Sequence, residues 1–128
     1  MARICCFIDT LTLRQHIQQY FAHTDDNLQM SSASLLNRAV RTKVQQFTPD
    51  LILMELSKSI DNPHIFFFLR SDCTTRQVPI IVFSNSVRLA EEAHILGADA
   101  HLPRDFTASQ FHLLLRRFLQ NKLRASAA

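Results

Sequence analysis

Short apolar runs alternate with stretches of helical periodicity five times along the chain, and this alternation restricts its fold more than any other feature. The runs at residues 3–8, 51–54 and 78–84 lack the strict apolar–polar alternation of a half-exposed strand. Such runs are typical of parallel strands that are covered on both faces. The expected strands are residues 3–8 (RICCFI), 28–31, 51–54 (LILM), 78–84 (VPIIVFS) and 98–102 (ADAHL).

Amphipathic stripes predict a helix after each strand. Leu13, Ile17, Tyr20 and Phe21 follow the i, i+4, i+7, i+8 spacing of one helix face. Comparable stripes, or end signals, predict the other helices. Asn62 followed by Pro63 is expected to be an N-cap and first helical residue, and Gly97 a C-cap. The expected helices are residues 10–23, 34–47, 63–71, 86–96 and 107–121.

Five βα units in sequence predict an α/β fold. Right-handed crossovers place helices on both faces of a parallel sheet, which gives a three-layer, doubly wound sandwich. The 128 residues suit one domain. We expect that domain over residues 1–122, with residues 123–128 as a disordered end or the start of a linker.

Composition excludes several classes of protein. No apolar run approaches the roughly 20 residues that span a bilayer, and no signal peptide is visible. The three cysteines and six histidines show no ligand-like spacing, so we expect no metal site and a reduced, cytoplasmic protein with buried thiols. The net charge of +3 is spread along the chain. Direct nucleic-acid binding is therefore an alternative only for a basic segment comprising Arg116, Arg117, Lys122 and Arg124.

Polar side chains stand where the predicted strands end. In a doubly wound sheet, the carboxyl ends of the strands form the edge at which sites are built. Asp9, Glu55, Ser84 and Arg104 all fall at that edge. No glycine-rich phosphate loop is present, which argues against nucleotide binding.

The segments RICCFID, PDLILMEL, RSDCTTRQVPIIVFSNS and GADAHLPRDF resemble the receiver domain of bacterial two-component response regulators. The resemblance covers nearly the whole chain. It implies a flavodoxin-like (βα)5 receiver fold whose five parallel strands have the order 2-1-3-4-5.

The resemblance also implies a degenerate phosphorylation site. The family holds Mg²⁺ with two acids and a phosphoacceptor Asp. Here Asp9 matches the second acid, Ile8 stands at the first, and Glu55 stands at the phosphoacceptor position. Ser84 matches the family's Thr or Ser, and Arg104 replaces its Lys.

These departures predict a non-enzymatic pseudo-receiver. Mg²⁺ needs nearly ideal octahedral oxygen ligands, and phosphoryl transfer tolerates little misplacement, so we expect impaired metal binding, no cofactor and no phosphotransfer. Glu55 is expected either to pair with Arg104, Ser84 or both, holding one signalling state, or to point to solvent. A working receiver that takes phosphate on Glu55 or Asp61 is the alternative.

In the family, an aromatic residue on the fifth strand swings inward when the Thr or Ser moves. His101 stands at that position, so we expect either a switch with Ser84 or a partly buried, hydrogen-bonded histidine.

With chemistry lost, function is expected to depend on contacts with a protein partner or a second copy. Dimers of the family use an acid and an Arg in ion pairs between the two copies. Asp99 stands at the position of the acid and Leu114 at the position of the Arg, with Arg116 and Arg117 nearby, so these residues form one candidate interface. Phe67 and Phe68 form another candidate interface, unless the third helix is rotated so that it buries them. The family also implies an output domain for transcription regulation beyond this chain.

Overall fold

All five predicted βα units are present in the computed structural model, which describes the backbone of residues 2–127 and the side chains of residues 2–119. The strands are β1 (Arg3–Phe7), β2 (Asn27–Ser31), β3 (Leu51–Glu55), β4 (Ile80–Phe83) and β5 (Ala100–Leu102). The helices are α1 (Leu11–Tyr20), α2 (Arg38–Phe47), α3 (Asp61–Ser71), α4 (Leu89–Leu96) and α5 (Ala108–Ala127).

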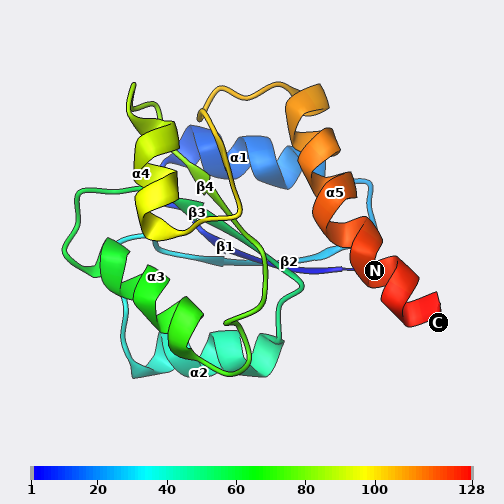
Figure 1. Cartoon of the computed structure of the whole chain (residues 1–128), viewed down its shortest axis with the longest axis horizontal. Coiled ribbons are helices and arrows are strands. Elements are labelled where there is room, and N and C mark those ends of the chain that lie inside the picture. The colour runs from blue at the N-terminus through cyan, green and yellow to red at the C-terminus, as the bar shows by residue number, and fades with distance from the viewer. Residues whose placement is uncertain (1, 128) are drawn as a thin grey trace.

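The five strands form one parallel sheet with the order β2-β1-β3-β4-β5, which confirms the predicted topology. Helix α1 and helix α5 lie on one side of the sheet, and α2 and α3 lie on the other (Figure 1). The strand order reverses next to β1, so the edge beyond β1 and β3 is where this topology builds a site.

Successive side chains of each strand enter different layers, because neighbouring residues in a strand point to opposite faces. On β1, Ile4 and Cys6 pack with the helices α1 and α5, whereas Cys5 and Phe7 pack with α2, α3 and α4. Strand β3 is buried along its whole length, which includes Glu55 at its end. The apolar core thus extends up to the edge where the polar residues begin.

Three helix ends can be compared with the predicted boundaries. Gly97 ends α4 with φ of 79°, the left-handed conformation that the prediction required. The prediction for Asn62 is wrong: α3 begins at Asp61, so Asn62 lies inside the helix and is buried. Helix α2 begins at Arg38, later than expected, because the side chain of Asn37 accepts a hydrogen bond from Val40 N and caps it.

Helix α5 continues to Ala127, beyond the expected end near residue 121. The proposed linker at residues 123–128 therefore begins within a helical segment, and residue 128 lies outside the described backbone. The side chains of Lys122 and Arg124 are also outside the described part of the chain. The domain boundary near residue 122 stays a prediction.

The cysteines are free in the described chain. Burial raises the pKa of Cys5 to about 12, so this thiol is held protonated. Cys73 is exposed, contrary to the expectation that all the thiols are buried. None of the helices in the described residues has the length and apolar character needed to cross a bilayer.

Candidate functional site

The carboxyl ends of the strands surround a cleft of about 760 Å³. The structure brings together all four residues that sequence reasoning assigned to this edge. Asp9 follows β1, Glu55 ends β3, Ser84 follows β4, and Arg104 follows β5. The other lining residues are Thr10, Leu56, Ser57, Lys58, Asn85, Ser86 and Glu92.

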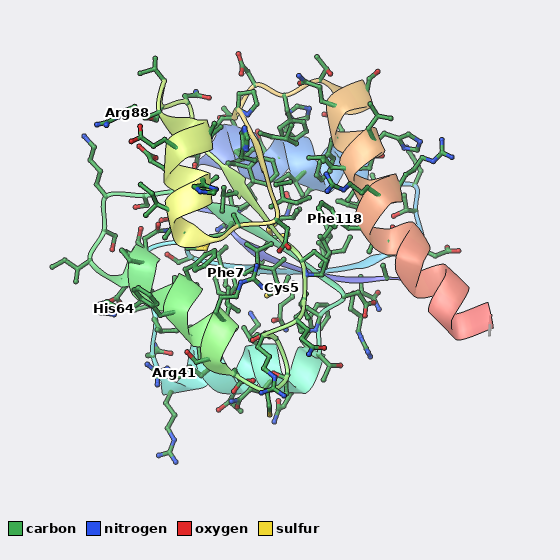
Figure 2. The ribbon with its side chains drawn as sticks, in the orientation of Figure 1. Cys5, Phe7, Arg41, His64, Arg88 and Phe118 are labelled. Carbon is green, nitrogen blue, oxygen red and sulfur yellow. The ribbon has the colours of Figure 1, made fainter. Side chains whose placement is uncertain are left out.

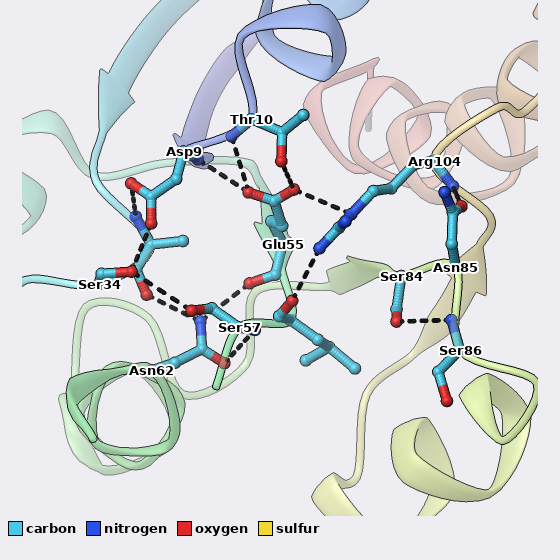
Figure 3. Close-up of polar contacts among 12 residues, drawn as sticks. Asp9, Thr10, Ser34, Glu55, Ser57, Asn62, Ser84, Asn85, Ser86 and Arg104 are labelled. Atoms are coloured by element: carbon cyan, nitrogen blue, oxygen red, sulfur yellow. Dashed lines mark hydrogen bonds and ion pairs between the residues drawn. The ribbon is translucent and has the colours of Figure 1, made fainter. Parts of the chain in front are cut away.

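Glu55 is the most heavily bonded group in this cleft (Figure 3), and its side chain is 2% exposed. Its Oε1 accepts hydrogen bonds from the backbone N–H groups of Asp9 (2.9 Å) and Thr10 (3.0 Å). Its Oε2 accepts a hydrogen bond from the Thr10 hydroxyl and lies 3.0 Å from Arg104 Nε. The alternative that Glu55 points to solvent is therefore wrong.

Arg104 links Glu55 to two neighbouring loops. Its Nε–H is not aligned on Glu55 Oε2, so that 3.0 Å contact is an ion pair without a directed hydrogen bond. One terminal nitrogen donates to the Leu56 carbonyl at 3.3 Å, and the backbone N–H donates to Asn85 Oδ1 at 2.8 Å. The cation thereby joins the loops after β3, β4 and β5.

Ser84 does not take part in this pairing. Its hydroxyl oxygen accepts a hydrogen bond from Ser86 N at 3.0 Å, and Figure 3 shows it turned toward that loop. Of the two partners predicted for Glu55, Arg104 contacts its carboxylate, whereas Ser84 forms its hydrogen bond with Ser86.

Thr10 is a site residue that sequence reasoning missed. It is the N-cap of α1, yet its hydroxyl accepts no capping bond from the helix and donates a hydrogen bond to Glu55. The carboxylate of Glu55 thus lies at the start of α1, where the helix dipole favours negative charge. The available signal was a hydroxyl residue directly after Asp9, at a strand end.

Asp9 turns away from Glu55, toward the loop between β2 and α2. One of its carboxylate oxygens accepts bonds from Ser32 Oγ (2.7 Å) and Ala33 N (3.1 Å), and the other accepts one from Ser34 Oγ. Partial burial acts to raise the pKa of Asp9, but these hydrogen bonds and the charge of Arg14 outweigh it and hold the pKa below its usual value.

This depressed pKa predicts a pH-dependent contribution of Asp9 to stability. The folded pKa lies below the unfolded value of about 3.9, so the contribution is complete above that pH and is lost as the pH falls through the folded pKa. The difference in unfolding free energy between wild type and Asp9→Asn, measured by urea unfolding from pH 7 to pH 3, should be constant near neutrality and shrink below about pH 4. A difference that is the same at every pH would contradict this role of the carboxylate.

Asn62 is a second residue whose role sequence reasoning missed. Its Oδ1 accepts a hydrogen bond from Ser57 N (3.1 Å), and its Nδ2 donates to the carbonyls of Ala33 (2.8 Å) and Glu55 (2.9 Å). One buried amide thereby joins the loop after β2, the end of β3 and the start of α3. The Asn62-Pro63 pair marked this position in the sequence, but the same pair also fits an N-cap followed by the first helical residue.

The remaining predicted residues lie outside the cleft. His101 is exposed on β5, contrary to the expectation of a partly buried histidine. Asp99 accepts hydrogen bonds from Arg70 (2.7 Å) and from Ile80 N (2.8 Å), so its carboxylate already has partners within the chain. Leu114 packs against the core. Arg116 and Arg117 are exposed on α5.

The two candidate aromatics of α3 differ from each other. Phe67 is 64% exposed, as expected for a contact residue. Phe68 is half-buried and packs against the core layer on that side of the sheet. Ile65, Phe66 and Leu69 form the buried face of α3, so the orientation of the helix covers part of Phe68 and leaves Phe67 exposed.

Comparison with known proteins identifies the fold. No family model and no curated protein matches this sequence. Solved structures do match. The N-terminal domain of the nisin resistance regulator NsrR, a lantibiotic response regulator, is 22% identical with a TM-score of 0.75, over 93% of this chain and 98% of that one.

The receiver domain of the sensor histidine kinase PA1611 from Pseudomonas aeruginosa is 16% identical with a TM-score of 0.78, also over 93% of this chain and 98% of that one. The chemotaxis protein CheY4 from Vibrio cholerae is 17% identical with a TM-score of 0.74, over 92% of this chain and 98% of that one. These neighbours are receiver domains of response-regulator type, and this chain has their fold. At such identities the likeness establishes the fold alone.

Proposed function

We propose that this chain is a pseudo-receiver, a signalling module that acts through protein contacts and does not transfer phosphate. The supporting observation is the Glu55 carboxylate, which is 2% exposed and paired with Arg104 at 3.0 Å. In a receiver fold, these residues stand where the resemblance places the phosphoacceptor and the cation that contacts the phosphoryl group. Here the acid and the cation satisfy each other, so the loops are held together without a phosphoryl group.

The ligand set of the cleft argues against magnesium. Both oxygens of Asp9 and both oxygens of Glu55 already accept hydrogen bonds within the protein. Ile8, at the position of the first acid, is fully buried in the core beside α1 and α5. Mg²⁺ demands octahedral oxygen ligands at about 2.0–2.1 Å, and binding it here would break bonds to Ser32, Ser34 or Thr10 without adding a third carboxylate. We therefore include weak or absent magnesium binding in the proposal.

Phosphorylation provides the direct test. We expect the mass of the intact chain to be unchanged after incubation with acetyl phosphate and Mg²⁺, while a receiver that accepts phosphate from this donor gains one phosphoryl group in parallel. The physical reason is that the attacking oxygen must be free and in line, and both Glu55 oxygens are occupied.

A phosphoryl adduct on this chain would overturn the proposal in favour of a working receiver. Fragmentation of the adduct would then distinguish Glu55 from Asp61. By the same criterion Asp61 is the less occupied of the two, since the hydrogen bond from Leu36 N at 3.1 Å goes to its Oδ2, whereas both oxygens of Glu55 accept hydrogen bonds.

A further inference from the structure

A second hollow lies between α2 and α3, away from the Glu55 cleft. We call it the α2–α3 groove; its volume is about 390 Å³. It shares no lining residue with the Glu55 cleft. Figure 2 shows the side chains of Arg41 and His64 on this side of the molecule. The groove is lined by Leu36, Arg41, Asp61, His64, Phe67, Phe68 and Ser71.

The α2 side of the groove is basic. Residues 27–49 contain no acidic residue, and α2 carries Arg38, Arg41 and Lys43. Arg38 and Arg41 are exposed and three residues apart, so they are neighbours on the helix surface. Lys43 reaches toward the Met30 carbonyl at 3.5 Å, so it lies nearer to β2. Arg41 lines the groove, and Arg38 lies three residues before it on the same exposed face of α2.

The acids at the two ends of α3, Asp61 at its start and Asp72 just after its end, both already accept hydrogen bonds. Asp61 lines the groove, but its Oδ2 accepts a hydrogen bond from Leu36 N. Asp72, at the far end of α3, accepts bonds from Gln45 and Thr74. Neither acid forms an ion pair with Arg38 or Arg41 in the described structure, so the positive charge of α2 is open to an outside partner.

The α3 side of the groove is aromatic. Phe67 exposes 64% of its surface and contributes little to the core. Beneath it, Phe68 packs under the guanidinium of Arg41, whose central carbon lies 5.6 Å from the ring centroid. This cation–π contact places the Arg41 guanidinium over the Phe68 ring. An exposed aromatic beside oriented arginines is characteristic of protein-recognition surfaces.

We propose that the α2–α3 groove docks an acidic segment of a partner protein, with one aromatic or aliphatic side chain packed on Phe67. Arg38 and Arg41 would hold flanking carboxylates, and arginine is suited to this because its guanidinium donates in parallel pairs. A duplex nucleic acid fits less well, since two arginines on one turn make few phosphate contacts and Asp61 lines the groove. The proposal goes beyond the pseudo-receiver assignment, because no groove residue contacts Glu55.

Fluorescence anisotropy tests this with a defined probe, a fluorescein-labelled heptapeptide of sequence EDEFEDE. The double variant Arg38→Glu, Arg41→Glu should bind at least about tenfold more weakly than wild type, since it replaces attraction by repulsion. The matched control is Arg116→Glu, Arg117→Glu, which changes the net charge equally on α5 and should bind less than about twofold more weakly. A peptide of sequence KKKFKKK should not bind.

The aromatic contribution has its own matched pair. Phe67→Ala should weaken binding about fivefold, whereas Leu113→Ala removes a side chain of similar exposure (66% against 64%) and should leave binding unchanged. Repeating the titration with Glu55→Gln separates this proposal from the pseudo-receiver one, because peptide binding should persist in that variant.

Four outcomes would overturn the proposal. The first is that the acidic peptide does not bind, and the second is that both charge-reversed variants lose the same amount of peptide affinity. The third is that a 12-base-pair DNA duplex binds more tightly than the peptide. The fourth is a dimer in analytical ultracentrifugation that only the Arg38→Glu, Arg41→Glu variant dissociates. The last outcome would assign the groove to a second copy of the chain.

Discussion

The Glu55→Ala variant is expected to unfold with a free energy about 3 kcal/mol below that of wild type at neutral pH. The substitution leaves the backbone N–H groups of Asp9 and Thr10 without their acceptor, together with the Thr10 hydroxyl. It also leaves Arg104, whose side chain is 34% exposed, without its counter-charge. Urea unfolding followed by circular dichroism measures the difference.

A double-mutant cycle isolates the ion pair from the other bonds. The single variants Glu55→Gln and Arg104→Gln and their combination should show a coupling of about 1–2 kcal/mol, larger than for an exposed pair because Glu55 is buried. The matched control is Arg88–Glu91, whose side chains are 70% and 58% exposed and whose coupling should stay below about 0.5 kcal/mol. Equal couplings at the two pairs would show that Glu55 and Arg104 do not hold the loops together.

The Asn62→Ala variant is expected to lose a similar amount, about 3 kcal/mol, because three backbone groups lose their partner in a buried place. The residue is 4% exposed, so water cannot easily replace the amide. Thermal and urea unfolding of the variant would measure this loss, and hydrogen exchange would show it locally at Ser57 N.

Asn37 offers the comparison that distinguishes a buried link from an ordinary cap. Asn37→Ala removes one hydrogen bond, to Val40 N, at an exposed helix start, and should cost only about 1 kcal/mol. If Asn62→Ala costs no more than Asn37→Ala, the three bonds of Asn62 contribute no more than a surface cap.

The fold was predictable because its signals are repeated. Each apolar run is long enough to identify a strand, and each helix carries a stripe or an end signal, so the five units support one another. Gly97 is an example: a glycine at a predicted helix end favours the left-handed C-cap conformation, and Gly97 adopts it at the end of α4. The start of α3 was misplaced because Asn-Pro is compatible both with an N-cap followed by the first helical residue and with the second and third residues of the first turn. The tertiary hydrogen bonds of Asn62 decided between them.

The cleft was predictable in its membership but only partly in its bonding. Strand ends place Asp9, Glu55, Ser84 and Arg104 at one edge whatever their side chains do. The direction of each side chain depends on loops that sequence patterns do not specify. Thus Asp9 turns to Ser32 and Ser34, and Ser84 turns to Ser86. The pairing of Glu55 with Arg104 was foreseeable because a buried acid needs a nearby cation.

The bonds of Glu55 also bear on the evolutionary history of the cleft. Since its carboxylate reaches the α1 start and Arg104 together, a change of Glu55 to aspartate shortens the side chain by one methylene and draws it away from these partners. Such a step would cost stability, and under the proposed function it would not by itself create a phosphorylation site, because Ile8 would still stand where the resemblance places an acid. Under the proposed pseudo-receiver function, we therefore expect descendants of this chain to keep glutamate at position 55 or to change several cleft residues together.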